Sequence, residues 1–168
     1  QRSWFEKSFK KYTGAKDAIT VSSCTAGMHL FYFSLNIGKG DEVIIPAQTH
    51  VATAHAVELS GAKPIFIDSE YPTGNIDINL IEKKITKKTK AIISVSLQGL
   101  PVDIDPIMKL AKARNITVIE DNAQDMLGNY KGKISGTNGH ISVWSFENKK
   151  HLSGATEGGI ITTNSKIL

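Results

Sequence analysis

Four short segments of this 168-residue chain combine residue types that could take part in chemistry. The first, residues 22–27, reads SSCTAG and leads directly into a segment with helical spacing of apolar residues. A strand-to-helix turn of small and hydroxyl residues gathers backbone N–H groups and the positive end of the helix dipole, which suits a phosphate group. Because serine and threonine are also ordinary helix N-caps, a purely structural role for this turn stays open.

Two consecutive carboxylates, Glu120 and Asp121, end a short apolar run at 118–119. Burying a charged carboxylate costs free energy unless a partner compensates it, so we expect a salt bridge, a metal ion or a protonated heterocycle beside this pair. A metal is disfavoured because the sequence shows no supporting His, Cys and Asp spacing.

The other two segments carry a histidine and a pair of lysines. His50 follows the apolar run 42–46 and could cap a helix, sit in the core or lay its ring against a flat cofactor. Lys149 and Lys150 follow the run 141–146. A lysine in a cleft can lose its proton through desolvation and a neighbouring cation and then act as a nucleophile, whereas two exposed loop lysines are the alternative.

Short β-rich runs, with helical spacing between most of them, predict the elements that position these segments. Seven strands are predicted, at 18–22, 42–46, 63–68, 91–96, 117–120, 141–146 and 159–163. Helices are predicted at 3–12, at 25–35, at 79–85 after an Asp77 N-cap, and from an Asp105 N-cap, with Pro106 in first position, to Asn115. This alternation predicts an α/β fold of three layers, α/β/α, around a mostly parallel seven-stranded sheet.

Ligands of such sheets bind beyond the carboxyl ends of the strands, and each of the four segments follows a predicted strand. An anion-binding turn, a flat-ring neighbour, a buried acid and a lysine would then meet at one edge. These are the groups that pyridoxal 5′-phosphate (PLP) requires, because its phosphate needs N–H and hydroxyl donors, its pyridine nitrogen an acid, and its aldehyde an amine.

Composition argues against several other classes of protein. Apolar stretches are interrupted within a few residues, so we expect no membrane span. The single cysteine, Cys24, excludes an internal disulfide and favours a reducing, cytoplasmic setting. Lysines clustered at 83–90 contribute to the net charge of +4 without interleaved aromatics, which favours a solvated face over nucleic-acid binding. Neither GxGxxG nor GxxxxGKS/T is present, which argues against an ordinary nucleotide-binding domain.

Five ordered blocks of the sequence resemble the DegT/DnrJ/StrS sugar aminotransferases, PLP-dependent enzymes of fold type I. The resemblance covers essentially the whole chain. The blocks are FEKSFKKYTGAKDAITVSSCTAGMHL, GDEVIIPAQTHVATAHAVELSGAKPIFID, IDINLIEKKITKKTKAIISVSLQG, VIEDNAQDMLGNYKGK and SFENKKHLSGATEGGIITTN.

The resemblance implies catalytic roles for Asp121 and Lys150. Asp121 corresponds to the acid that pairs with the pyridine nitrogen, and Lys150 to the lysine that forms a Schiff base with the cofactor. The spacing of five residues from Ser145 favours Lys150 over Lys149 as the Schiff-base lysine. A subset of relatives has histidine at this position and dehydrates a keto sugar at C3, so a shift of register onto His151 would favour a dehydratase-like function.

Further cofactor contacts are implied in the same way. Gln124 corresponds to the glutamine that hydrogen-bonds the phenolic oxygen of the cofactor. Ser145, Thr25 and the backbone amide of Cys24 correspond to the phosphate pocket, although the family commonly has glycine in place of Cys24. His50 stands where the family usually has an aromatic residue stacked on the ring.

The function implied by the resemblance is transfer of an amino group from an amino acid, expected to be glutamate, to a keto sugar, expected to be nucleotide-linked. Family members are longer homodimers with a C-terminal small domain. Residues 1–168 are therefore expected to be a PLP-binding large domain, shortened at both ends and without the small domain, and to form a homodimer. A truncated, non-catalytic PLP-binding protein is the other alternative.

Overall fold

A computed structural model describes residues 2–154 and 156–165 and contains a seven-stranded sheet in the order β1-β9-β8-β5-β4-β2-β3. Its strands are β1 (Asp17–Val21), β2 (Glu42–Pro46), β3 (Lys63–Ile67), β4 (Thr89–Val95), β5 (Thr117–Asp121), β8 (Ile141–Ser145) and β9 (Gly159–Thr163). Strand β9 is antiparallel to both of its neighbours, and the other pairs are parallel. The predicted mostly parallel α/β sheet is confirmed.

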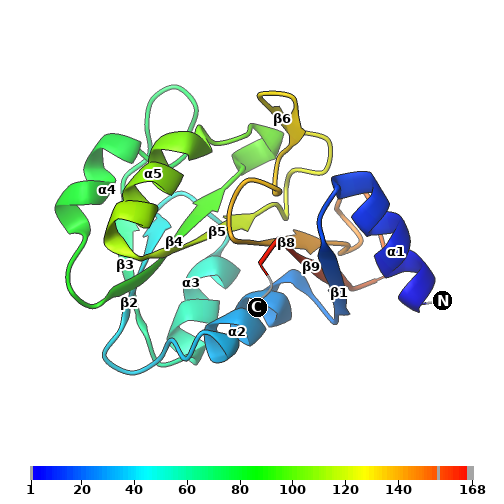
Figure 1. The fold of residues 1–168 in the computed structure, drawn as a ribbon, viewed down its shortest axis with the longest axis horizontal. Helices are drawn as coiled ribbons and strands as arrows, with labels where there is room; N and C mark the ends of the chain where they lie inside the picture. Colours follow the sequence, from blue (N-terminus) through cyan, green and yellow to red (C-terminus); the bar gives the residue numbers. More distant parts are fainter. Residues whose placement is uncertain (1, 155, 166–168) are drawn as a thin grey trace.

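Helices cover both faces of the sheet, as Figure 1 shows. They are α1 (Arg2–Thr13), α2 (Cys24–Ser34), α3 (Val51–Leu59), α4 (Ile78–Lys84) and α5 (Ile104–Arg114). Helices α2 and α3 lie together on one side, and α4 and α5 lie on the other (Figure 1). In the described residues, no helix is both long enough and apolar enough to cross a membrane.

Side chains alternate between the two faces of the strands, which explains why one apolar run can serve two cores. In β4, Ile93 packs in the cluster that includes α2 and α3, whereas its neighbour Ile92 packs with α4 and α5. In β8, Val143 joins the first cluster and Trp144 contributes to a third, under α1. Double burial of this kind is why these strands are nearly continuous runs of apolar residues.

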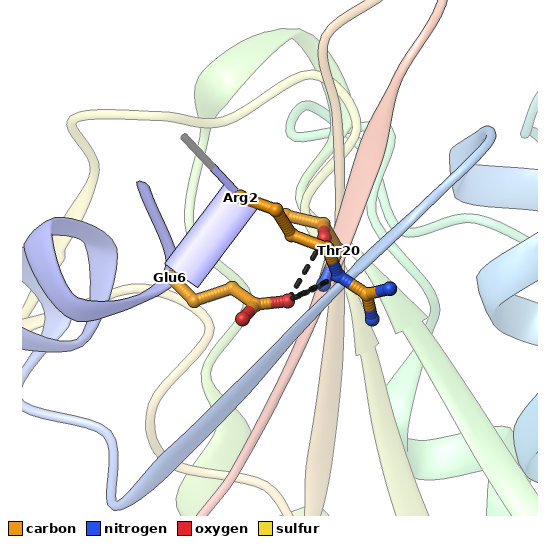
Figure 2. A network of polar contacts seen from close by, with 3 residues as sticks. All are labelled: Arg2, Glu6 and Thr20. Carbon is orange, nitrogen blue, oxygen red and sulfur yellow. Dashed lines mark hydrogen bonds and ion pairs between the residues drawn. The ribbon is translucent and has the colours of Figure 1, made fainter. Parts of the chain in front are cut away.

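One carboxylate of helix α1 accepts several hydrogen bonds, two of them from the edge strand β1. Glu6 accepts hydrogen bonds from the backbone N–H of Thr20 at 2.9 Å, from its hydroxyl at 2.8 Å, and from Arg2 Nε at 3.0 Å (Figure 2). These bonds lower the pKa of Glu6 to about 2, and the backbone N–H of Thr20 contributes the largest part. The helix ends as predicted at Gly14, whose φ of 75° suits glycine and whose N–H donates to the Lys10 carbonyl.

The predicted start of α5 is wrong by two residues. The helix begins at Ile104 after Asp103, so Pro106 occupies the third helical position and Asp105 lies inside the first turn. Proline is tolerated there because first-turn N–H groups have no partner within the helix. Asp103 makes no capping bond and instead accepts the hydroxyl of Tyr130.

Four short elements, namely one helix, two strands and one 3-10 turn, were not predicted from the sequence. Helix α3 consists mostly of alanine, valine and threonine, and this gives little polar alternation to detect. The hairpin of β6 (Asn129–Tyr130) and β7 (Lys133–Ile134) has two residues per strand, and the 3-10 turn η1 (Leu97–Gly99) has three. Segments this short carry no measurable periodicity.

Candidate active site

A pocket of about 360 Å³ lies on the segments that follow β1, β2, β5 and β8. Because these strands are parallel, their carboxyl ends meet at the same edge of the sheet. The pocket is lined by all seven residues that the sequence predicts as site residues: Cys24, Thr25, His50, Asp121, Gln124, Ser145 and Lys150. The structure therefore brings the predicted set together, with α2 and α3 supplying one wall.

Asp121, the last residue of β5, is a buried acid with a 4% exposed side chain. Its Oδ1 accepts the backbone N–H of Ala123 at 3.0 Å and the Cys24 thiol at 3.8 Å, and its Oδ2 accepts the Thr53 hydroxyl at 3.1 Å. Burial raises the pKa of Asp121, and the donors and the charge of Lys150 oppose that rise. Asp121 forms no ion pair with any residue in 2–154 or 156–165, so its charge faces the pocket without a cation in direct contact.

The two lysines after β8 differ in their relation to this acid. Lys150 is half-buried, and its charge lowers the pKa of both Asp121 and Cys24. Lys149 also lines the pocket but is exposed, and its backbone N–H donates to the side chain of Glu147. Of the two lysines, Lys150 is therefore the one whose charge acts on Asp121.

The turn after β1 becomes the first turn of α2. Ser23 is the N-cap, and its hydroxyl accepts the N–H of Ala26 at 3.1 Å. The N–H groups of Cys24 and Thr25 belong to the first turn and have no partner within the helix, so they are available to an anion. The capping and anion-binding interpretations of this turn are therefore compatible, since different residues serve each.

Close packing of β9 supports this turn. A Cβ atom on Gly159 would lie 2.7 Å from the backbone N of Cys24 and 2.7 Å from the carbonyl carbon of Ser23. No side chain fits at this position without moving the backbone, so glycine is required for β9 to approach the turn.

His50 caps α3 and also lines the pocket. Its Nδ1 accepts the N–H of Ala52 at 3.2 Å, and its side chain is exposed, so the alternative of a core histidine is wrong. Across the pocket, Gln124 Oε1 accepts the backbone N–H of Gln98 at 2.9 Å. This bond fixes the orientation of the side-chain amide and leaves its Nε2 to donate to a ligand.

Glu120 and Asp121 point to opposite faces of β5, as neighbours on a strand must. Glu120 is buried and accepts three backbone N–H groups, from Gly136 at 3.0 Å, Asn138 at 2.8 Å and Gly139 at 2.5 Å. The two consecutive carboxylates are thus compensated separately. Glu120 anchors the loop before β8, and Asp121 alone faces the pocket.

Sequence reasoning missed Thr53, which lines the pocket and binds Asp121 from α3. Thr49, which lies just before the N-cap His50, was missed as well, because no helix was predicted over 51–59 and no local signal distinguishes either threonine. Their Oγ1 atoms lie 2.9 Å apart. Within the described part of the chain, no group of three His, Cys, Asp or Glu side chains is arranged to hold a metal ion.

Comparison with known proteins gives consistent matches over the whole chain. The family model of the DegT/DnrJ/EryC1/StrS aminotransferase family matches residues 1–168. The chain is 45% identical over 164 residues to GDP-perosamine synthase of Escherichia coli O157:H7, an alignment that covers 98% of this chain and 45% of that protein. The aminotransferase structure from Psychrobacter cryohalolentis aligns with a TM-score of 0.96 at 40% identity, over 99% of this chain and 42% of the other.

A dehydratase is also similar in structure. The Escherichia coli GDP-4-keto-6-deoxy-D-mannose-3-dehydratase, solved with bound hydrated PLP, aligns with a TM-score of 0.90 at 33% identity, over 97% of this chain and 43% of that one. The chain thus spans less than half the length of each of these three proteins. With a family model that matches from first residue to last, and with the fold and pocket described above, the chain belongs to the DegT/DnrJ/EryC1/StrS aminotransferase family.

Proposed function

We propose that this chain carries the cofactor site of a PLP-dependent aminotransferase that moves an amino group from an amino acid to a nucleotide-linked keto sugar. The observation that carries the proposal is the joining of Asp121, Lys150 and the first turn of α2 in one pocket. Family membership supports the reaction type. The identity to a relative named GDP-perosamine synthase supports a nucleotide-linked sugar as the acceptor, and glutamate is the amino donor that we expect.

The residues present fit PLP in three respects. Asp121 is a buried acid without a cation in contact among the described residues, which suits a protonated ring nitrogen. The amides of Cys24 and Thr25, with the nearby hydroxyl of Ser145, suit a phosphate. Lys150 supplies the primary amine.

When bound, PLP supplies an aldehyde that accepts primary amines and a protonated ring that draws electrons from the reacting carbon. The chain's own residues supply the rest. Asp121 holds a proton on the ring nitrogen, Gln124 offers its Nε2 to the phenolic oxygen, and the exposed ring of His50 offers a flat surface beside the ring. Lys150 Nζ acts as the general base that carries the transferred proton.

The dehydratase alternative is less well supported. It would need histidine in place of Lys150, or a register shifted onto His151. His151 lines a different, apolar groove beside α1, together with Trp4 and Leu127, and does not line the pocket of Asp121. The position facing Asp121 is therefore occupied by an amine, which supports amino transfer.

The rest of the proposal concerns the protein in the cell. We propose a homodimer, as in the family that the sequence resembles, with the keto sugar and the amino donor as ligands. The unpaired Cys24 supports a reducing, cytoplasmic setting.

Covalent labelling tests the proposal. The chain is incubated with PLP, reduced with borohydride and digested, and the phosphopyridoxyl lysine is located by mass spectrometry. We expect the label on Lys150, its loss in Lys150→Arg, and its retention in the matched control Lys149→Arg. Label on Lys149 would contradict the assigned register, and an unlabelled but folded protein would contradict the cofactor. Bleaching of the cofactor's visible absorption by glutamate then distinguishes an enzyme from a non-catalytic PLP-binding protein.

A further inference from the structure

A buried threonine on α3 contacts the acid of the pocket directly. Thr53 is 1% exposed and lies in the first turn of the helix. Its Oγ1 donates to Asp121 Oδ2 at 3.1 Å, and its other polar neighbour is Thr49 Oγ1 at 2.9 Å. Two hydroxyls and one carboxylate thus form a hydrogen-bonded chain from the half-buried Thr49, just before α3, to the end of β5.

The direction of this chain follows from counting protons. An ionised carboxylate can accept hydrogen bonds but cannot donate them, so Thr53 must donate its one hydroxyl proton to Asp121. Thr53 then has no proton left for Thr49, and Thr49 must be the donor in the bond between them. The arrangement Thr49 to Thr53 to Asp121 is therefore complete when Asp121 is ionised.

Few other groups can hold Asp121 in that state. The titratable groups that interact with it electrostatically are Cys24 and Tyr32 of α2 and Lys150 after β8. The other titratable side chains that line the same pocket are His50, Glu147, Lys149 and Glu157. The thiol of Cys24 is a weak donor at 3.8 Å. Among side chains, Thr53 opposes the burial-driven rise in the pKa of Asp121 more than Lys150 or Cys24 does, and the backbone N–H of Ala123 opposes it most.

We propose that Thr53 is a positioning residue for the reaction, whose hydroxyl, oriented by Thr49, holds the Asp121 carboxylate ionised and in one orientation toward the pocket. This inference rests on the proposed function, since the pairing with a protonated ring nitrogen requires Asp121 to be an anion. Thr53 acts through Asp121 and need not touch a substrate. Its contribution is to keep the Asp121 carboxylate ionised before any ligand arrives.

The test measures the pKa of Asp121 in the chain without cofactor. Side-chain carboxyl carbons of aspartate are labelled with carbon-13, the Asp121 signal is assigned by its loss in Asp121→Asn, and its pKa is measured by NMR titration. Thr53→Val keeps the shape but removes the donor, and because a hydrogen bond to a charged group is lost we expect the pKa of Asp121 to rise by about 1 to 2 pH units. Thr53→Ser should return the pKa close to the wild-type value.

Two further variants keep the test decisive. Thr49→Val, at a half-buried position, should raise the pKa of Asp121 by less than Thr53→Val, because it removes the orienting donor alone. Thr13→Val is the matched control, since Thr13 is also buried but donates to the Phe9 carbonyl in α1, and it should leave the pKa unchanged.

An unchanged pKa of Asp121 in folded Thr53→Val would overturn the proposal and leave a bond that merely joins α3 to β5. Should Thr53→Val not fold, an unchanged pKa in Thr49→Val would overturn it instead. Because the titration uses no PLP, its failure is distinct from a failure of labelling at Lys150, which would refute the proposed function.

Discussion

Substitution of Gly159 by alanine tests how the pocket is built. Its added Cβ would lie 2.7 Å from Cys24 N and from the Ser23 carbonyl carbon, and ordinary van der Waals contact begins at 3.4 Å. These are backbone atoms that cannot rotate aside, so β9 and the first turn of α2 must separate by about 0.7 Å. We expect this overpacking to lower the free energy of unfolding by about 1–3 kcal/mol.

The same displacement moves an amide that we expect to bind the phosphate. A hydrogen bond of ordinary length, about 2.9 Å, would stretch beyond its useful range if Cys24 N moved by that amount. Losing one hydrogen bond to a charged group costs about 1.5–3 kcal/mol, so PLP affinity should fall about 10- to 100-fold. Urea unfolding without PLP and a spectroscopic titration with PLP measure the two effects separately.

The adjacent glycine provides the control. A Cβ on Gly158 would meet Phe146 Cβ at 3.4 Å, an ordinary contact, so Gly158→Ala should resemble the wild type in both assays. If Gly159→Ala matched Gly158→Ala in stability, the close approach of β9 to Cys24 would be wrong. If it were destabilised but bound PLP normally, the amide of Cys24 would not be part of the phosphate site.

Two further predictions concern the fold. Glu6 has a folded pKa of about 2 against an ordinary 4.5, so its attachment of α1 is present above about pH 4.5 and is lost as the pH falls toward about 2. The difference in unfolding free energy between wild type and Glu6→Gln should shrink over that range, and a difference that grew on acidification would refute the assignment. Ile93→Ala removes a fully buried side chain of β4 and should cost about 2–5 kcal/mol of stability in urea unfolding. Phe33→Ala, at an 80% exposed position, is the contrast and should change stability by less than about 0.5 kcal/mol, and equal effects of the two would contradict the assigned core.

The candidate site residues could be predicted before the fold was known, and the reason is local. Each of the seven main strands is five to seven residues long and contains consecutive apolar or β-branched residues, and the polar segments that follow several of these strands differ clearly from them in composition. Parallel strands bring their carboxyl ends to one edge whatever their order, so the two carboxylates, the two lysines and the turn at Cys24 could be placed together from pattern. The choice of Asp121 and Lys150 within those pairs came from the family resemblance.

Other features depend on contacts between distant segments. The order of the strands sets β9 against the turn of α2, and it is this neighbour that makes Gly159 irreplaceable. Thr53 became a contact of Asp121 because α3, which packs against α2, β2 and β3, brings its first turn to the end of β5, although nothing in its local sequence distinguishes it. Hydrogen-bond partners separated by 68 residues leave no periodic signal.

Glu120 and Asp121 show most clearly the difference between local sequence properties and long-range contacts. The sequence by itself determined that two carboxylates end a buried strand and need compensation, because apolar runs and charges are local properties. The tertiary structure decided which partners each one has: backbone amides of the loop 136–139 for Glu120, and Thr53, Cys24 and the pocket for Asp121. The physical reason is that adjacent side chains of a strand enter opposite layers, and the occupants of those layers are fixed by long-range packing.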